Sequence, residues 1–249
     1  MYADRLARSG YDLILVARRA DKLRALAEDI TNRTGRSVET LSADLLDPAD
    51  LAKVEWVLKA DASITMLVNN AGIGATAPLL QSDVDEMARM IALNVNVPTR
   101  LAYAAAPAFI SRRTGTIVNI ASIVAIAPEV LNGVYGGSKA YVLALSQSLQ
   151  HELADKGVRV QAVLPGATRT DFWQHAGTPV EHLPSEIVMS AEDMVDAALA
   201  GLAQGEVVTI PSLPDIADWD AYEGARRGLT PKLSLAVPAP RYAVGARGG

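Results

Sequence analysis

The stretch Gly115-Thr-Ile-Val-Asn-Ile-Ala-Ser122 is a short, largely apolar run, and a second such run, Val158-Arg-Val-Gln-Ala-Val-Leu164, follows after a long helical segment around Tyr135. Short apolar runs of this kind predict strands that are covered on both faces. Two strands separated by a helix predict a parallel pair joined by a crossover connection. This strand, helix and strand form the unit from which the predicted fold extends in both directions.

The same alternation continues on either side of that unit. Strand-like runs cover residues 12–17, 37–43, 64–68, 116–121, 158–164 and 207–210, and helical patterns cover residues 21–33, 48–60, 83–113, the segment around Tyr135 and one that opens at Ser190. This repeated pattern predicts an α/β fold with a doubly wound parallel sheet. We expect a single domain over residues 1–236, followed by a loosely ordered tail rich in Pro, Gly and Ala over residues 237–249.

Composition narrows the class of protein. A chain of 249 residues, half of them hydrophobic, can bury a large core in one domain. The net charge of −5 gives no electrostatic footprint for nucleic acid or an anionic membrane. No Cys is present, and His151, His175 and His182 show no metal-ligand spacing, so no metal site is predicted. The apolar runs are too short to span a bilayer, which leaves a cytoplasmic protein as the default expectation.

Tyr135 and Lys139 are four residues apart on the predicted helix, and Ser122 ends the preceding strand-like run. Positions i and i+4 share a helix face, so the ammonium can lie close to the phenol and lower its pKa toward the range of a general acid or base. Ser122 can then orient a carbonyl oxygen. The plainer interpretation, a half-buried ring beside a solvated charge, is the commoner one for Tyr-x-x-x-Lys alone.

Three further motifs accompany the pair: Asn69-Asn-Ala-Gly72 after a strand-like run, Leu93-Asn-Val-Asn-Val-Pro98 within a helical segment, and Pro165-Gly166 after another strand-like run. In this order and spacing the set resembles the short-chain dehydrogenase/reductase family. The resemblance runs from the first helix to about residue 210, and it implies a Rossmann-like sheet.

The start of the chain departs from the family pattern. Relatives begin with a strand and a Gly-rich turn that holds the cofactor pyrophosphate, whereas residues 1–10 resemble the helix that follows that turn. We therefore expect the first, central strand to be missing. A fragment, a wrongly chosen start codon and a lineage-specific truncation would all look like this, and each predicts lower stability and weaker cofactor binding.

The resemblance implies a catalytic set of Asn94, Ser122, Tyr135 and Lys139. Tyr135 would exchange a proton with the substrate oxygen, Ser122 would hold that oxygen, and Lys139 would lower the Tyr135 pKa and contact the nicotinamide ribose. Asn94 would interrupt a helix and hold a water; its alternative is a helix-bend residue, and Asn96 shows how easily the wrong Asn is chosen.

The implied cofactor is NADP, because Arg18 and Arg19 stand where relatives that prefer NAD place an acidic residue. Two arginines at a strand end would otherwise be ordinary surface charge. The remaining positions that match the cofactor-binding pattern are Asp44, Leu45, Asn70, Ala71, Gly72, Tyr135, Lys139, Pro165, Gly166, Thr168 and Thr170.

The segment after Pro165-Gly166 would form a lid over residues 171–190. Its apolar side chains suggest a small-molecule carbonyl or alcohol substrate with hydrophobic bulk, although simple packing of the lid explains them equally; they are Phe172, Trp173, Val180, Leu183 and Pro184. The Ala-rich helix over residues 101–110 and the Tyr135 helix favour a homodimer or homotetramer, and burial against the sheet explains much of the same pattern.

Three functions fit the sequence. The first is an NADP(H)-dependent oxidoreductase that transfers hydride between nicotinamide and a carbonyl or alcohol. The second is a catalytically silent or weakly active subunit of the same fold that has lost phosphate binding through truncation at its N-terminus. The third, an epimerase or dehydratase, is disfavoured because such enzymes have a larger C-terminal substrate domain.

Overall fold

The computed structural model describes residues 1–242, and these fall into two compact units. Residues 1–211 form the first unit. The second begins at Ser212 and contains α9 (Ile216–Gly228), whose first turn is capped by the carboxylate of Asp215. The predicted domain over residues 1–236 stays a prediction. Of the predicted tail, residues 243–249 lie outside the described residues.

The strands of the first unit form two parallel sheets. One contains β1 (Leu13–Ala17) and β2 (Val38–Ser42). The other has the order β3, β4, β5, β6, with bounds Met66–Asn69, Gly115–Ile120, Val158–Val163 and Val208–Thr209. Every pairing within both sheets is parallel, and helices connect successive strands. The prediction of an α/β, doubly wound parallel fold is confirmed.

The helices follow the predicted alternation. Their bounds in the first unit are α1 Tyr2–Arg8, α2 Ala20–Thr34, α3 Pro48–Ala60, α4 Val84–Ile91, α5 Val97–Arg112, α6 Gly133–Leu153, α7 Phe172–Ala176 and α8 Ala191–Gln204.

The two sheets do not pair with each other. β1 bonds only to β2 and β3 only to β4, so within the described part of the chain no strand lies between β1 and β3. This interruption falls where the sequence led us to expect a missing strand. The side chains of β1 are half-buried or exposed, whereas those of β4 are almost entirely buried.

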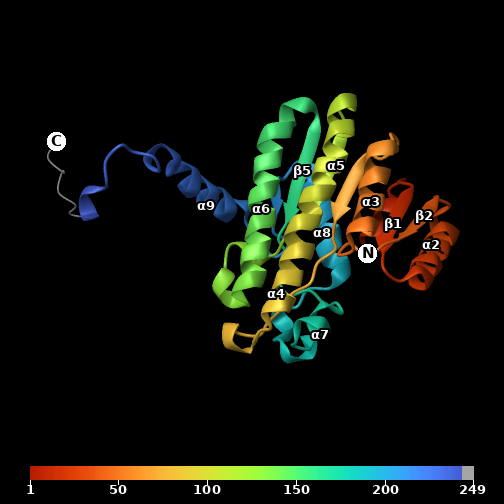
Figure 1. The fold of residues 1–249 in the computed structure, drawn as a ribbon, viewed down its shortest axis with the longest axis horizontal. Coiled ribbons are helices and arrows are strands. Elements are labelled where there is room, and N and C mark those ends of the chain that lie inside the picture. Colours follow the sequence, from red (N-terminus) through yellow and green to blue (C-terminus); the bar gives the residue numbers. More distant parts are fainter. Residues whose placement is uncertain (243–249) are drawn as a thin grey trace. The chain divides into compact units, whose positions relative to one another are not determined.

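Helices cover both faces of the four-stranded sheet. On one face, α5 and α6 pack against β4 and β5, with Phe109, Ile117 and Leu153 in the shared core (Figure 1). On the other face, α8 packs against the sheet through Val195 and Ala198, which contact Val118. This arrangement leaves the carboxyl ends of the strands free to form a site at one edge.

The helix predicted over residues 83–113 is interrupted. The segment Ala92–Asn96 between α4 and α5 forms a π-helical turn, and Pro98 follows in the first turn of α5. A π turn adds a residue to the helical repeat and changes the direction in which the next side chains point. It leaves Asn94 buried and Asn96 exposed.

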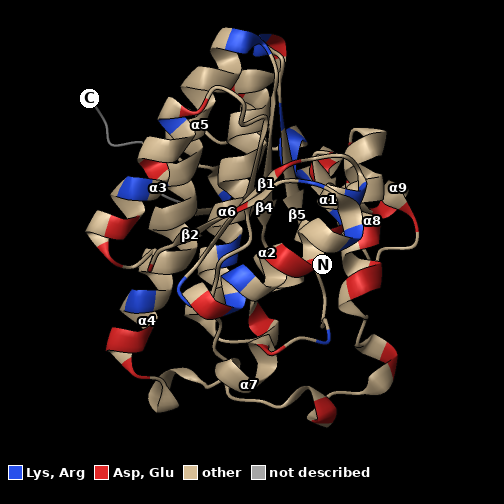
Figure 2. Ribbon diagram, turned by 90° about the vertical axis from the view of Figure 1, so that its right-hand side faces the viewer, with Lys and Arg blue, Asp and Glu red and all other residues tan. Residues whose placement is uncertain are grey.

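Basic and acidic residues are interspersed on the ribbons of α3 and α4 (Figure 2). No helix in the described residues is long and apolar enough to cross a membrane. The cytoplasmic location stays a prediction.

Candidate active site

The helix that contains Tyr135 is anchored at its start by Asn132. The side-chain oxygen of Asn132 accepts hydrogen bonds from the backbone N–H groups of Val134 and Tyr135, at 2.9 and 3.3 Å. Its side-chain nitrogen donates to the carbonyl oxygen of Ala77 at 2.7 Å. Asn132 therefore caps α6 and also ties it to the loop after β3.

Tyr135 and Ser122 meet at the carboxyl end of β4. Both are buried, with 6% and 8% of their surface exposed, and their hydroxyl groups are hydrogen-bonded to each other. Ser122 also lies 3.4 Å from the carbonyl oxygen of Pro165, which places it between the ends of β4 and β5. The predicted pairing of these two hydroxyls is present.

Lys139 lies on the same face of α6. Its ammonium is 5.9 Å from the centre of the Tyr135 ring and donates a hydrogen bond of 2.8 Å to the carbonyl oxygen of Ile120. Burial lowers the pKa of Lys139 to about 8. A buried ammonium has lost its hydration, and here one backbone carbonyl replaces part of it.

The expected lowering of the Tyr135 pKa is wrong for this structure. Burial raises the pKa of Tyr135 to about 12, and the hydrogen bond with Ser122 only partly opposes this. The phenolate would be poorly solvated, and the Lys139 ammonium is bonded to Ile120 rather than to the phenol oxygen. In this state Tyr135 is a protonated hydroxyl.

Asn94 joins the loop after β3 to α6. Its side-chain nitrogen donates to the carbonyl oxygen of Ile73 at 2.8 Å and to the Ser138 hydroxyl at 3.0 Å, and its oxygen accepts from the Ile73 N–H at 3.0 Å. A Cβ on Gly72 would lie 3.2 Å from the Asn94 oxygen and 3.5 Å from the Lys139 nitrogen. Gly72 therefore lets this loop approach both side chains closely. The predicted water on Asn94 stays a prediction.

Asn119 connects two side chains rather than bracing the backbone. It accepts a 2.8 Å hydrogen bond from the side chain of Asn69 and donates one of 2.9 Å to the Ser146 hydroxyl. The residue is fully buried. It links β3, β4 and α6. Its side-chain hydrogen bonds go to Asn69 and Ser146 and not to the hydroxyls of Ser122 and Tyr135.

Apart from Tyr135 and Lys139 on α6, the positions matched to cofactor binding follow the carboxyl ends of strands. Arg18 and Arg19 are exposed directly after β1, and Asp44 follows β2 with its carboxylate accepting from the Leu46 N–H at 3.0 Å. Leu45 packs against the core and does not face outward. Residues 70–72, which are Asn70, Ala71 and Gly72, are exposed after β3, and Pro165, Gly166, Thr168 and Thr170 follow β5.

This edge suits two parts of a nicotinamide dinucleotide. The exposed guanidinium groups of Arg18 and Arg19 follow β1, and the exposed Gly72 follows β3 close to the buried Lys139. The Thr168 and Thr170 hydroxyls bond to carbonyl oxygens within their own loop, and hydroxyl groups can rotate toward another partner. No Gly-rich turn that could hold a pyrophosphate occurs in the described residues.

A lid follows β5. Its base is closed where Thr168 forms a bridge with Met189, and Trp173 on α7 donates from its ring nitrogen to the carbonyl oxygen of Thr168 at 2.9 Å. The Phe172 ring lies 5.7 Å from the Tyr135 ring, measured between centres. Among the predicted lid residues, Trp173 and Val180 are buried, Phe172 and Leu183 are half-buried and Pro184 is exposed.

Comparison with known proteins identifies the family. Residues 1–180 match the short chain dehydrogenase family, which is well over half of the chain. The chain belongs to the short-chain dehydrogenase family. These enzymes are oxidoreductases that use a nicotinamide cofactor, and the predicted family is thereby confirmed.

Two solved short-chain dehydrogenases resemble the whole chain. One, from Sphingobium yanoikuyae in complex with NADPH, is 49% identical with a TM-score of 0.93, and the match covers 97% of this chain and 94% of that one. The other is the bulky-bulky ketone specific alcohol dehydrogenase from Comamonas testosteroni, 42% identical with a TM-score of 0.88, covering 97% and 92%.

Two curated relatives are less similar in sequence. The human 17-beta-hydroxysteroid dehydrogenase type 3 is 32% identical over 202 residues, which are 80% of this chain and 62% of that protein. A very-long-chain 3-oxoacyl-CoA reductase from Coccidioides immitis is 34% identical over 168 residues, 66% of this chain and 48% of that protein. The chain thus spans from about half to less than two thirds of these relatives.

Sequence reasoning missed several residues of this short-chain dehydrogenase site. Asn132 carried a usable signal, since Asn directly before a helix is a common N-cap. Gly74 and Thr76 gave none, because their importance comes from contacts with the lid, about one hundred residues away in sequence.

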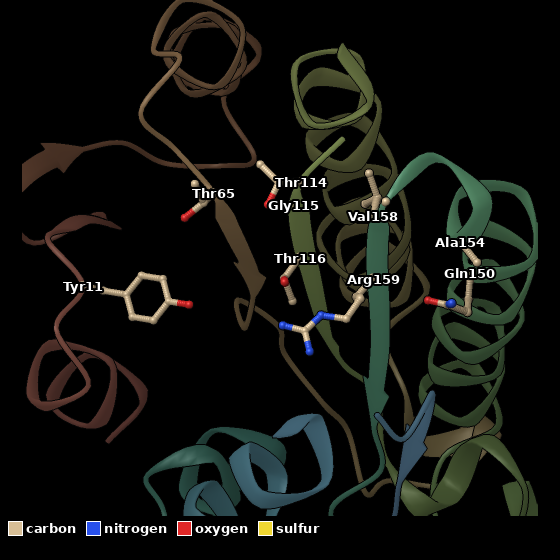
Figure 3. Close-up of a pocket in the computed structure, with 10 residues that line it drawn as sticks. Tyr11, Thr65, Thr114, Gly115, Thr116, Gln150, Ala154, Val158 and Arg159 are labelled. Atoms are coloured by element: carbon tan, nitrogen blue, oxygen red, sulfur yellow. The ribbon is translucent and has the colours of Figure 1, made fainter. Parts of the chain in front are cut away.

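A pocket of about 410 Å³ lies elsewhere in this short-chain dehydrogenase, at the amino ends of β3, β4 and β5. In Figure 3 the side chains of Tyr11 and Arg159 point toward each other across it. It lies at the opposite edge of the sheet from Ser122 and Tyr135, so it is not the predicted site.

Proposed function

We propose that this chain is an NADP(H)-dependent oxidoreductase that transfers hydride between nicotinamide and a carbonyl or alcohol substrate. The observation that most supports this is the buried hydrogen bond between Ser122 and Tyr135, with the Lys139 ammonium 5.9 Å from the Tyr135 ring. These groups lie at the carboxyl edge of a parallel sheet, where folds of this type bind their ligands.

In this proposal Tyr135 acts as the general acid in reduction and the general base in oxidation. Its raised pKa, about 12, keeps the proton on the phenol oxygen until a substrate oxygen develops negative charge. Ser122 donates to the same oxygen and fixes its position. A bound nicotinamide supplies or accepts the hydride. Lys139 adds positive charge beside the ring, which favours proton release from Tyr135.

Arg18 and Arg19 support NADP over NAD. A guanidinium group can form paired hydrogen bonds to a phosphate, and both side chains are exposed directly after β1. The Sphingobium yanoikuyae relative, 49% identical, was solved in complex with NADPH.

The substrate proposed is a ketone or secondary alcohol with apolar substituents. The Phe172 ring lies 5.7 Å from the Tyr135 ring, and the Trp173 ring is 5.5 Å from that of Phe172 and perpendicular to it. The Comamonas testosteroni relative, 42% identical, is specific for bulky-bulky ketones. An apolar lid matches substituents of that chemistry.

We also propose a homodimer or homotetramer. Tyr103 on α5 and Tyr141 on α6 are 69% and 38% exposed, large apolar surfaces on helices that otherwise pack against the sheet. Light scattering after size exclusion should give a mass of two or four chains, and a monomer at micromolar concentration would contradict this.

The deciding experiment compares the wild type with Tyr135→Phe. NADPH binding is measured by calorimetry, and turnover of a phenyl ketone by loss of NADPH absorbance. We expect the variant to bind NADPH as the wild type does and to lose at least about a hundredfold in turnover, the usual contribution of a positioned acid. Equal turnover would refute the role of Tyr135. Wild type that neither binds NADPH nor turns over any ketone would favour the silent-subunit alternative.

A further inference from the structure

We propose that Phe172 sets the size limit for the substrate substituent beside Tyr135, and that Gly74 fixes the position of the Phe172 ring. This inference rests on the proposed function. It names a residue of the lid that determines specificity without taking part in proton transfer.

The first observation is the contact between Phe172 and Gly74. A Cβ built on Gly74 would lie 2.2 Å from Cζ of the Phe172 ring and 2.5 Å from Cε2. Real Cβ atoms do not approach carbon so closely, so the ring rests directly on the backbone of Gly74. Any other residue at this position would displace the ring.

The second observation is that two further rings hold Phe172. The Tyr135 ring is 5.7 Å away with a tilt of 41°, and the Trp173 ring is 5.5 Å away and perpendicular. Trp173 is itself fixed, since it is 8% exposed and donates to the carbonyl oxygen of Thr168. Phe172 therefore packs beside the ring that carries the reacting hydroxyl of Tyr135.

The third observation is that α7 is fastened at its far end. The N–H and hydroxyl of Thr76 donate to the carbonyl oxygen of Ala176 at 3.0 and 2.9 Å, and the Thr178 hydroxyl donates to that of Thr76 at 3.0 Å. At the base, the Arg169 N–H donates to the carbonyl oxygen of Met189 at 2.9 Å. With both ends held, the backbone that carries Phe172 cannot move away unless several hydrogen bonds break.

A fixed wall predicts a size limit. A substituent that faces Phe172 meets a ring that is held in place, so a longer alkyl group must displace the ring or the lid. Misfit of one methylene in an apolar pocket costs roughly 10-fold or more in kcat/KM. Of the two substituents of the ketone, the one that faces Phe172 is therefore the one limited in size.

The test uses phenyl alkyl ketones with methyl, ethyl and butyl groups, in the wild type, Phe172→Ala and Ile187→Ala. Ile187 is a matched control because it lies on the same lid and is 56% exposed. We expect kcat/KM to fall about tenfold or more from methyl to butyl in the wild type and in Ile187→Ala. In Phe172→Ala the fall should disappear through a lower KM for the butyl ketone. A profile in Phe172→Ala that stays parallel to the wild type would overturn the proposal.

A second measurement does not depend on turnover. Gly74→Ala should lower the melting temperature by roughly 2–4 °C, the shift expected for about 1 kcal/mol in a chain of this size, and should have little effect in the Phe172→Ala background. Additive effects would refute the contact between Gly74 and Phe172. If the wild type turns over no ketone, the proposed function fails; calorimetric binding of the three ketones with NADP present then decides the size limit, which requires weaker binding of the butyl ketone in the wild type alone.

Discussion

The ammonium of Lys139 donates a hydrogen bond of 2.8 Å to the carbonyl oxygen of Ile120. Ile120 is the last residue of β4, so this bond fixes α6 to the strand end that leads into Ser122. The same burial that shapes the site lowers the pKa of Lys139 to about 8. Lys139 therefore both fixes the position of α6 and carries a charge whose pKa depends on that position.

The Lys139 pKa predicts how stability depends on pH. Its pKa falls from 10.5 in the unfolded chain to about 8 in the folded one, so between these values only the unfolded chain holds the proton. The free energy of unfolding should therefore rise with pH in this window, by about 2 kcal/mol between pH 7 and 9.5 at 1.36 kcal/mol per unit. Urea unfolding at both pH values measures it.

Lys139→Met is the variant that isolates this effect. It keeps the length and apolar stem of the side chain and removes the titrating group, so the rise between pH 7 and 9.5 should shrink by that amount. A rise of equal size in the variant would assign the pH dependence to other groups.

Arg18 and Arg19 predict a change in cofactor preference. Replacing both with Ala should raise the NADPH dissociation constant at least about tenfold and leave NADH binding nearly unchanged, because only NADPH has the 2′-phosphate. Calorimetry with both cofactors measures the ratio. The control replaces Lys22 and Arg24, two exposed cations of α2 that lie past the strand end. An unchanged ratio in the first variant would exclude Arg18 and Arg19 as the phosphate contact.

Asn94 and Asn96 offer a matched pair. Asn94→Ala removes hydrogen bonds to Ile73 and Ser138 from a buried site. The variant should lose about 1–3 kcal/mol of unfolding free energy, and its turnover should fall. Asn96 is exposed, and Asn96→Ala should change neither. Chemical unfolding and ketone reduction are measured side by side. Similar losses in both variants would mean that the π turn itself, and not the Asn94 side chain, is what matters.

Asn119 predicts a loss of stability without a change in chemistry. Asn119→Ala removes the side-chain hydrogen bonds to the partly buried Asn69 and the buried Ser146, at a cost of about 1–3 kcal/mol. The pH profile of turnover at low temperature should keep its shape. A shifted profile would place Asn119 in the proton path.

Local signals explain what the sequence predicted well. The helix over residues 48–60 is found as α3 with the same bounds, because Asp47 caps its first turn and Pro48 suits the first helical position. The strands were predicted from short apolar runs, and each falls within about two residues of its expected bounds. The helix cap and the apolar runs each depend on only a few neighbouring residues, so the sequence alone can show them.

Long-range packing explains the failures. Helical periodicity alone predicted one continuous helix over residues 83–113, and only the family resemblance implied the interruption at Asn94 that the π turn at Ala92–Asn96 forms. The Tyr135 pKa depends on burial and on the carbonyl oxygen that Lys139 selects, and neither follows from a spacing of four residues. The contact between Gly74 and Phe172 joins segments that only the fold brings together.

Because of the interruption between β1 and β3, backbone amides in the two sheets should exchange with solvent at different rates. Strand β4 has hydrogen-bonded neighbours on both sides, so its amides should exchange with deuterium only through large-scale unfolding. Strand β1 is held on one side by β2, and its contacts reach the rest of the first unit mainly through helices. The pair β1 and β2 should therefore form a separate cooperative layer that opens and recloses while the sheet from β3 to β6 stays protected.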